Sequence, residues 1–201
     1  MKNKRKTIAI DIDGTLRNFD KQVDLWLEVD HVDKLEKFRN SSSYYKLDEA
    51  FDGNKESVHK WIYEVRPFQL FVQAERLHNN VMGELNFFSI AAEKSGWDVV
   101  IASKQHGRAI TSTLYWLAKW GCRVKNIQFF DCMEDKLKNG FDAFLDDCPL
   151  VLENALKKKK IALKVPYSFN EHINCPPIDI INGHFNDIYE ALGIERILEK
   201  K

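Results

Sequence analysis

The chain has 201 residues, 44% of them hydrophobic, and its 30 lysine and arginine residues balance its 30 aspartate and glutamate residues. This length and apolar share predict one globular domain, or one domain that carries a smaller insertion. Because the net charge is zero, the chain has no overall positive field to hold nucleic acid or an anionic membrane, so we expect anions to bind only at a local site.

The first predicted element is a short buried strand at residues 7–10. Its β-branched, apolar sequence is typical of a central parallel strand that is covered on both faces. Residues 18–82 are rich in charged and aromatic residues and show a mostly helical pattern, with no comparable strand. Residues 41–43 and 52–54 are the expected breaks between helices. We therefore predict a small helical cap, residues 18–82, inserted after the first strand.

From Gly83 onward, the pattern alternates between strands and helices. The expected strands cover residues 97–102, 124–130, 141–145 and 160–165, with a last short one at 178–181; the expected helices cover 83–95, 111–117, 149–156 and 185–192. This alternation predicts an α/β fold with a doubly wound, Rossmann-like parallel sheet. The predicted core consists of residues 1–17 and 83–201.

Polar residues gather where the predicted strands end, which is where ligands bind in doubly wound sheets. They are Asp11 and Asp13 after the first strand, Ser103 after the second, Lys136 in a later connection, and Asp146 and Asp147 after the strand that follows it. Four carboxylates with one lysine would repel one another unless a hard cation lay among them. Mg²⁺ prefers oxygen ligands and commonly shares them with substrate phosphates, so we expect a magnesium site that also binds phosphate.

The charges suggest a role for each of these residues. Asp11 is the candidate nucleophile on phosphorus, and Asp13, on the same side of an extended chain, is the candidate acid and base. Lys136 and Ser103 are expected to hold the non-bridging phosphate oxygens, and Lys104 is a further candidate phosphate ligand. The sequence thus predicts hydrolysis of a phosphate monoester through an aspartyl-phosphate.

These residues resemble the motifs of the haloacid dehalogenase superfamily. Residues 11–15 are similar to the DxDGT motif of its phosphatases, and Ser103, Lys136 and Asp146-Asp147 resemble its second, third and fourth motifs in the same order. The resemblance covers about two thirds of the chain. It implies a metal held by Asp11, the Asp13 main-chain carbonyl and one of Asp146 and Asp147, with either of the two as the direct ligand.

Within that superfamily, the chain is most similar to 5′-nucleotidases of the 5′(3′)-deoxyribonucleotidase type. Asp135-Lys136 leads to Asp146-Asp147 in one segment, as in that group, and Phe19 falls where those enzymes place an aromatic near the base. Ser103 departs from the pattern, since Lys104 and Gln105 follow it in place of a second hydroxyl and a proline. The resemblance implies a (deoxy)nucleoside monophosphate as substrate, with Phe19, Tyr44 and Tyr45 as candidate contacts to it.

Several alternatives remain open at this point. Ser103 could simply begin a helix. Lys138 competes with Lys136 for the phosphate role, but the spacing from Asp135-Lys136 to Asp146-Asp147 decides for Lys136. The substrate could be another small phosphometabolite or the 3′ end of a nucleic acid, and a protein of another class, a non-catalytic binding protein, could use the same fold. We expect no membrane contact and no extended nucleic-acid binding, and leave open a homodimer.

The apolar stretch behind the basic N-terminal residues is too short for a signal peptide. No apolar stretch of the sequence approaches the length of a transmembrane helix. The four cysteines show neither a CxxC pair nor zinc-ligand spacing. We therefore expect a cytoplasmic protein with reduced thiols.

Overall fold

The computed structural model describes residues 4–41 and 44–196, which form two compact units. The first unit contains Met1–Leu16, Arg76–Lys104 and Gly121–Lys201, and the second contains Arg17–Glu75 and Gln105–Trp120. These units divide the chain at other residues than the predicted core and cap. Residues 105–120 join the second unit because their helix packs against a helix that begins at Pro67.

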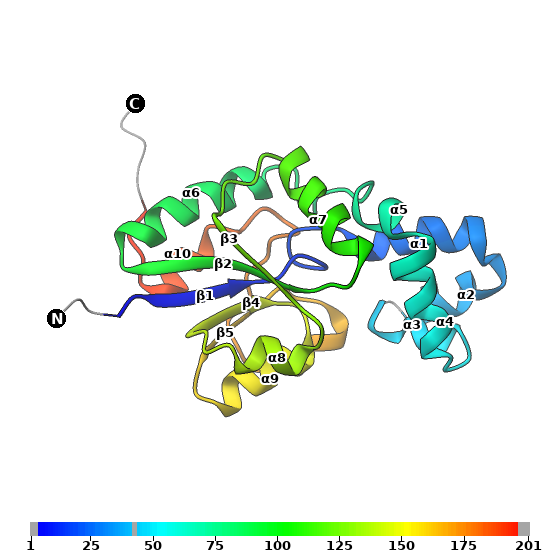
Figure 1. The fold of residues 1–201 in the computed structure, drawn as a ribbon. Helices are drawn as coiled ribbons and strands as arrows, with labels where there is room; N and C mark the ends of the chain where they lie inside the picture. The colour runs from blue at the N-terminus through cyan, green and yellow to red at the C-terminus, as the bar shows by residue number, and fades with distance from the viewer. Residues whose placement is uncertain (1–3, 42–43, 197–201) are drawn as a thin grey trace. The chain divides into compact units, whose positions relative to one another are not determined.

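Five parallel strands form the sheet of the first unit, in the order β3-β2-β1-β4-β5 (Figure 1). They are β1 (Lys6–Ile10), β2 (Trp97–Lys104), β3 (Asn126–Phe130), β4 (Ala143–Asp146) and β5 (Ile161–Lys164). The central strand β1 is the apolar run found in the sequence, and its Ile8, Ala9 and Ile10 are buried because both faces of the sheet are covered. The predicted fold class is confirmed.

The carboxyl ends of the three middle strands meet at one edge of the sheet. Ile10 pairs with Ile101 of β2 and with Leu145 of β4, and the main-chain N–H of Asp11 donates to Leu145 at 3.0 Å. Strand β2 runs further than predicted, so Ser103 and Lys104 lie inside it and not behind its end. They extend the strand because Phe129 and Phe130 of β3 pair with them.

Helices cover both faces of this sheet, as a doubly wound fold requires. Figure 1 shows α6 and α10 on one face and α8 and α9 on the other. The helices of the first unit are α6 (Val81–Lys94), α8 (Met133–Lys138), α9 (Pro149–Lys157) and α10 (Asp187–Leu192), with a short 3₁₀ turn η3 (Ser168–Asn170). Helix α8 was not expected from the sequence, which had suggested only a connection around Lys136.

The predicted short strand at 178–181 is wrong. A single bridge joins Lys164 to Pro177, and the N–H of Ile178 donates to the carbonyl of Lys164 at 2.8 Å. The chain then turns, with the N–H of Gly183 bonded to Ile180. Ile178 and Ile180 are buried by this turn, so their apolar pattern resembles a strand without forming one.

The described residues of the second unit are entirely helical where they form regular elements. The elements are α1 (Phe19–Asp30), α2 (Val32–Ser41), η1 (Tyr44–Lys46), α3 (Leu47–Ala50), α4 (Lys55–Lys60), the π-helical turn η2 (Trp61–Val65), α5 (Pro67–Phe71) and α7 (Arg108–Lys119). The predicted break at 52–54 is present: Asp52 and Gly53 turn the chain with positive φ, and Asn54 caps α4. Residues 42–43 of the other predicted break lie outside the described residues.

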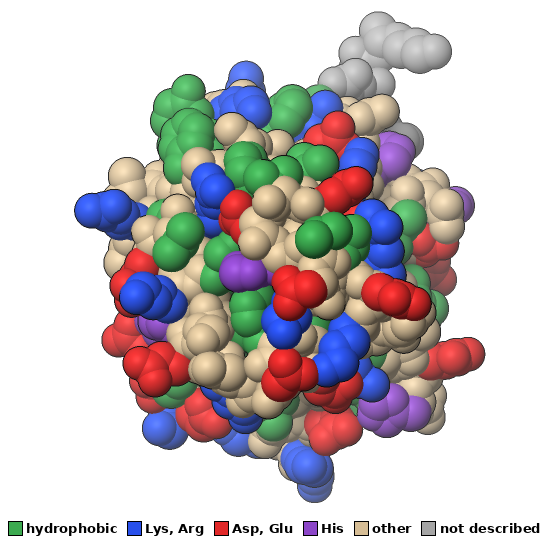
Figure 2. Space-filling view, turned by 90° about the vertical axis from the view of Figure 1, so that its right-hand side faces the viewer, with side chains coloured by type: hydrophobic (Ala, Val, Ile, Leu, Met, Phe, Trp, Pro, Cys, Tyr) green, Lys and Arg blue, Asp and Glu red, His purple; other side chains and the backbone are tan. Residues whose placement is uncertain are grey.

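The surface carries both signs of charge in close mixture. On the face drawn in Figure 2, lysine and arginine side chains stand among aspartate and glutamate side chains, as the balanced composition leads one to expect. All four cysteines are free thiols. No helix in residues 4–41 and 44–196 combines the length and apolar character that a membrane crossing requires.

Candidate functional site

Three buried carboxylates come together at the edge of the sheet where β1 and β4 end. Asp11 directly follows β1, Asp146 is the last residue of β4, and Asp147 follows it. Their exposed fractions are 5%, 1% and 0%, and one oxygen of each lies within 4.8 Å of the others. Such a set of oxygen donors fits a hard divalent cation such as Mg²⁺, which favours carboxylate ligands.

Lys136 is buried among these carboxylates. It lies on α8 and is 0% exposed, and its Nζ is 2.6 Å from Asp11 Oδ1 and 2.7 Å from Asp146 Oδ2. The competing Lys138, by contrast, is largely exposed and pairs with Asp135 at 3.2 Å. Because α8 turns Lys136 inward and Lys138 outward, only Lys136 joins the carboxylate cluster.

Burial and neighbouring charges change how this cluster ionises. Burial raises the pKa of Asp11 to about 7; Lys136 opposes this shift, while Asp146 and Asp13 add to it. Burial alone would lower the pKa of Lys136, but the attraction of Asp11 and Asp146 outweighs it, and the pKa is raised above its usual value. Lys136 therefore stays charged, whereas Asp11 needs a further positive charge to ionise fully at neutral pH.

The turn after β1 is closely packed against Asp147. Gly14 has φ +76°, and a Cβ placed on it would overlap with Asp147 Oδ2. Only glycine fits this position, since the backbone is left-handed and the carboxylate occupies the space of a side chain. The N–H groups of Thr15 and Leu16 both donate to the carbonyl of Ile12, which closes the turn.

Asp146 is held in place by the main chain that follows it. Its Oδ1 accepts a hydrogen bond from the N–H of Cys148 at 2.9 Å, while its Oδ2 faces Lys136. Pro149 then begins α9, so the strand, the acidic pair and the helix follow one another without a loop. Asp13, two residues after Asp11, is also buried.

The other predicted phosphate ligands lie on the neighbouring strand. Ser103 is 2% exposed and stands two residues beyond Ile101, the partner of Ile10, at the same edge of the sheet as the carboxylates. Lys104, the last residue of β2, is half-buried beside Phe130. The alternative in which Ser103 begins a helix does not apply, because it pairs within the sheet.

The predicted substrate contacts all belong to the second unit. Phe19 is buried in the apolar core of that unit, where its ring stacks on Phe71 at 5.2 Å. Tyr45 is half-buried in η1, and Tyr44 begins the same element. Core packing explains the position of the Phe19 side chain. A substrate role for Phe19, Tyr44 and Tyr45 stays a prediction.

Three residues near the cluster had no role in the sequence analysis. Thr15 is fully buried, and its Oγ1 has no hydrogen-bond partner among the described residues, which suits a hydroxyl kept for a ligand. The Tyr167 hydroxyl donates to the Gly14 carbonyl, and the Asn170 amide donates to the Asp147 carbonyl, both at 2.9 Å. Thr15 already belongs to the motif at residues 11–15, although no role was assigned to it there, whereas nothing in the sequence singles out Asn170.

Comparisons with known proteins support the fold. No protein-family model matches the chain, and no curated protein matches it. A solved dehalogenase with an intermediate complex has 12% identity and a TM-score of 0.58, and the match covers 94% of this chain and 98% of that one. A protein from Clostridium acetobutylicum described as a predicted phosphatase has 14% identity and a TM-score of 0.57, with 92% and 98% covered.

A third similar structure is a protein described as a HAD-hydrolase, YfnB from Bacillus subtilis, in a magnesium-bound form. It has 11% identity and a TM-score of 0.56, and the match covers 96% of this chain and 100% of that one. At such identities, the likeness concerns the fold. The chain shares the α/β fold of haloacid-dehalogenase-like proteins.

Proposed function

We propose that the protein is a magnesium-dependent phosphomonoester hydrolase that forms an aspartyl-phosphate on Asp11. The observation that carries this proposal is the buried cluster of Asp11, Asp146 and Asp147, with Lys136 bonded to two of them. Buried carboxylates destabilise a fold unless positive charge compensates them, and one lysine compensates only part of the charge. A site of this kind suits a divalent cation and an anionic substrate.

The cation would be held by the carboxylates of Asp11 and of Asp146 or Asp147, together with the main-chain carbonyl of Asp13. When bound, it supplies positive charge that keeps Asp11 ionised and neutralises the phosphate oxygens. Thr15, with its buried hydroxyl, stands beside these ligands in the sequence.

The residues of the chain can carry out the two halves of the reaction. A carboxylate oxygen of Asp11 forms a bond to phosphorus while the bond from phosphorus to the alkoxide breaks, and Asp13 gives its proton to the departing alkoxide. Asp13 then takes a proton from a water, which attacks phosphorus and breaks its bond to Asp11, releasing phosphate. Lys136, held by Asp11 and Asp146, and the Ser103 hydroxyl hold the phosphate oxygens throughout.

For the substrate, we propose a (deoxy)nucleoside monophosphate, cleaved as by a 5′-nucleotidase. The support is the single segment from Asp135-Lys136 to Asp146-Asp147, which the structure folds as α8 followed by β4. The sequence resembles the deoxyribonucleotidase group in this respect, because there too the lysine and the acidic pair lie in one segment. The balanced surface charge also favours a small substrate over a long nucleic acid.

The proposal is tested by a phosphatase screen with added Mg²⁺. The panel contains nucleoside monophosphates, sugar phosphates, a 3′-phosphorylated oligonucleotide, an aryl phosphate and a 2-haloacid. We expect phosphate release that is greatest with nucleotides, that requires Mg²⁺, and that is abolished in Asp11→Asn, with Asp13→Asn nearly as damaged. The matched control is Asp33→Asn, which changes an exposed carboxylate on α2 in the same way.

Each other outcome has a definite meaning. Normal turnover in Asp11→Asn would contradict the nucleophile. Release of halide without release of phosphate would contradict the phosphatase reaction. No magnesium-dependent hydrolysis of any phosphate, the aryl phosphate included, would favour a binding protein on the same fold.

A further inference from the structure

The loop that follows β5 makes hydrogen bonds at two points to the main chain beside the carboxylate cluster. Tyr167 reaches the turn after β1, where its hydroxyl donates to the Gly14 carbonyl at 2.9 Å. Asn170 reaches the segment after β4, where its Nδ2 donates to the Asp147 carbonyl at 2.9 Å. One short loop thus bonds to both chain segments that supply carboxylates to the candidate metal site.

The two loop residues are also bonded to each other, which closes a ring of contacts. The N–H of Tyr167 donates to Asn170 Oδ1 at 3.0 Å, and the carboxylate of Asp147 packs against Gly14. The ring therefore runs from Gly14 to Tyr167, to Asn170, to Asp147 and back to Gly14. A displacement of either carboxylate-bearing segment would strain or break a hydrogen bond of this ring.

Asn170 is built into the protein as a fully satisfied polar group. It is 0% exposed, its amide nitrogen donates to the carbonyls of Asp147 and Val165 at 2.9 and 2.8 Å, and its oxygen accepts from Tyr167. A buried amide with all these bonds holds a single orientation, because rotation would leave carbonyls unpaired. Asn170 therefore holds Val165, the residue after β5, and Asp147, the residue after β4, in fixed positions.

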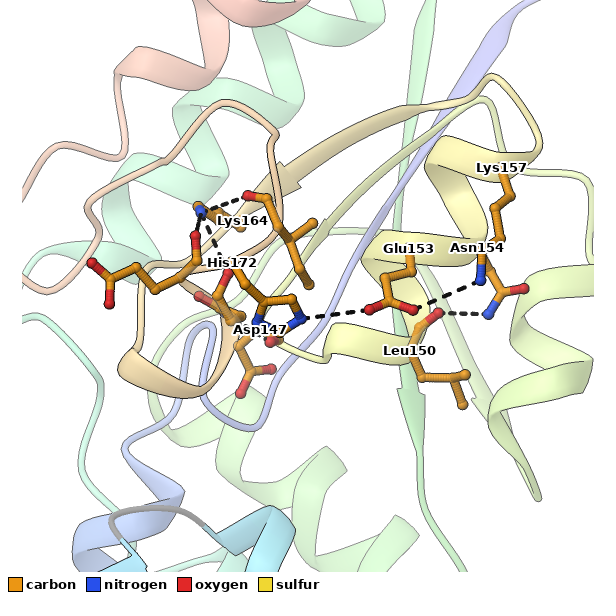
Figure 3. A network of polar contacts seen from close by, with 10 residues as sticks. Asp147, Leu150, Glu153, Asn154, Lys157, Lys164 and His172 are labelled. Carbon is orange, nitrogen blue, oxygen red and sulfur yellow. Dashed lines mark hydrogen bonds and ion pairs between the residues drawn. The ribbon is translucent and has the colours of Figure 1, made fainter.

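Lys164 makes hydrogen bonds to the second half of the same loop, residues 170–173. Its Nζ lies 2.7 Å from the carbonyl of Ile173 and within 3.4 Å of the carbonyls of Asn170 and Glu171 (Figure 3). Beside it in Figure 3, His172 approaches Glu153 of α9 at 3.5 Å. The loop is thus tied to β5 and lies close to α9, and it can act as a fixed support.

We infer that Tyr167 and Asn170 are positioning residues that hold Gly14 and Asp147 so that the carboxylates of the cluster can bind a divalent cation. The inference rests on the proposed function in that the cation is part of that proposal. Neither residue touches the cation itself; each bonds to the main chain of a segment that carries a ligand. Hydrogen bonds of this supporting kind orient ligands, and losing one typically weakens metal binding about 10- to 100-fold.

The test measures binding of Mg²⁺ alone, by isothermal titration calorimetry, to the wild type, Tyr167→Phe and Asn170→Ala. Tyr167→Phe removes one hydroxyl and keeps the ring that stacks on Phe169. We expect each variant to bind Mg²⁺ roughly 10-fold more weakly, and raised Mg²⁺ to restore its turnover. The matched controls are Asn174→Ala, an exposed asparagine of the same loop, and Tyr115→Phe, an exposed tyrosine of α7; both should bind as the wild type does.

The outcomes separate this inference from the proposed function. If the wild type binds Mg²⁺ and both variants bind it equally well, the inference is overturned, even if they unfold more easily in EDTA, because a merely structural role lowers stability alone. If Asn170→Ala does not fold, Tyr167→Phe decides. If the wild type itself binds no Mg²⁺, that result contradicts the proposed function, and the inference fails with it.

Discussion

Gly14 stands where both the backbone and the space around it exclude a side chain. Its φ of +76° is costly for other residues, and the Asp147 carboxylate lies where a Cβ would be. Gly140 has nearly the same φ, +79°, but nothing lies within 4 Å of its would-be Cβ. Comparing Gly14 with Gly140 therefore separates the cost of the positive φ from the cost of the contact with the Asp147 carboxylate.

We predict that Gly14→Ala destabilises the protein more than Gly140→Ala does. Gly140→Ala should lower the free energy of unfolding by about 1 kcal/mol, the usual cost of a left-handed alanine. Gly14→Ala should add about 1–3 kcal/mol for the displaced Asp147 and should also weaken Mg²⁺ binding. Urea unfolding of both variants in EDTA measures the difference; equal losses would show that Asp147 moves aside without cost.

At the scale of elements, one carboxylate joins three parts of the second unit. Asp30, at the end of α1, accepts hydrogen bonds from Arg66 at 2.6 and 2.7 Å and from the Trp61 indole at 2.9 Å. The guanidinium of Arg66 also lies over the Trp26 ring at 4.6 Å. Since Arg66 directly precedes α5 and Trp61 begins η2, this cluster ties α1 to both.

We predict that Asp30→Ala lowers the free energy of unfolding at pH 7 by about 1.5–3 kcal/mol, as expected for charged hydrogen bonds that are partly buried. The matched control is Glu75→Ala, which breaks an exposed pair with Lys21 in the same unit and should cost at most about 1 kcal/mol. The measurement is urea unfolding of both variants. Equal losses would contradict a special role for Asp30.

The effect of Asp30 should depend on pH in a definite direction. The hydrogen bonds from Arg66 lower the pKa of Asp30; partial burial opposes them, and the Trp61 bond adds to them. The unfolded chain therefore takes up this proton before the folded one, so the contribution of Asp30 is present above about pH 4 and is lost in more acid solution. The gap between wild type and Asp30→Ala should narrow as the pH falls below 4; a constant gap would contradict this account.

At the scale of the whole chain, the candidate metal site joins segments that are far apart in the sequence. Asp11 follows the first strand, whereas Asp146 ends the fourth strand and Asp147 follows it. A cation bound between them would act only in the folded state, because the unfolded chain does not bring these carboxylates together. Binding would therefore stabilise the fold as well as serve the reaction.

We predict that Mg²⁺ at ten times its wild-type Kd raises the free energy of unfolding of the wild type by about 1.4 kcal/mol, and that the same concentration does so far less in Asp11→Asn. Because the pKa of Asp11 is about 7 before a cation binds, a proton competes with the cation. At one fixed Mg²⁺ concentration, the stabilisation should therefore be larger at pH 8 than at pH 6, because the proton on Asp11 weakens binding at the lower pH. Thermal unfolding with Mg²⁺ and with EDTA at both pH values measures it, and an equal effect at both would contradict a role for Asp11 in binding.

The sequence by itself determined the fold class and the residues that follow the strands. Apolar runs such as residues 7–10 specify a buried parallel strand locally, and the alternation with helices predicts the doubly wound sheet that the structure confirms. The same order places Asp11, Asp146 and Asp147 at strand ends, which the structure brings within reach of one cation. Their catalytic roles stay predictions.

Only the tertiary structure decided which neighbours these residues have. The burial of Lys136 between two carboxylates, the packing of α7 with the second unit, and the turn in place of a strand at 178–181 all depend on contacts between segments far apart in the chain. So does the ring through Tyr167 and Asn170. Hydrophobic periodicity and turn residues indicate locally which residues are buried and where the chain turns. A hydrogen bond to a distant main-chain carbonyl produces no such pattern in the sequence.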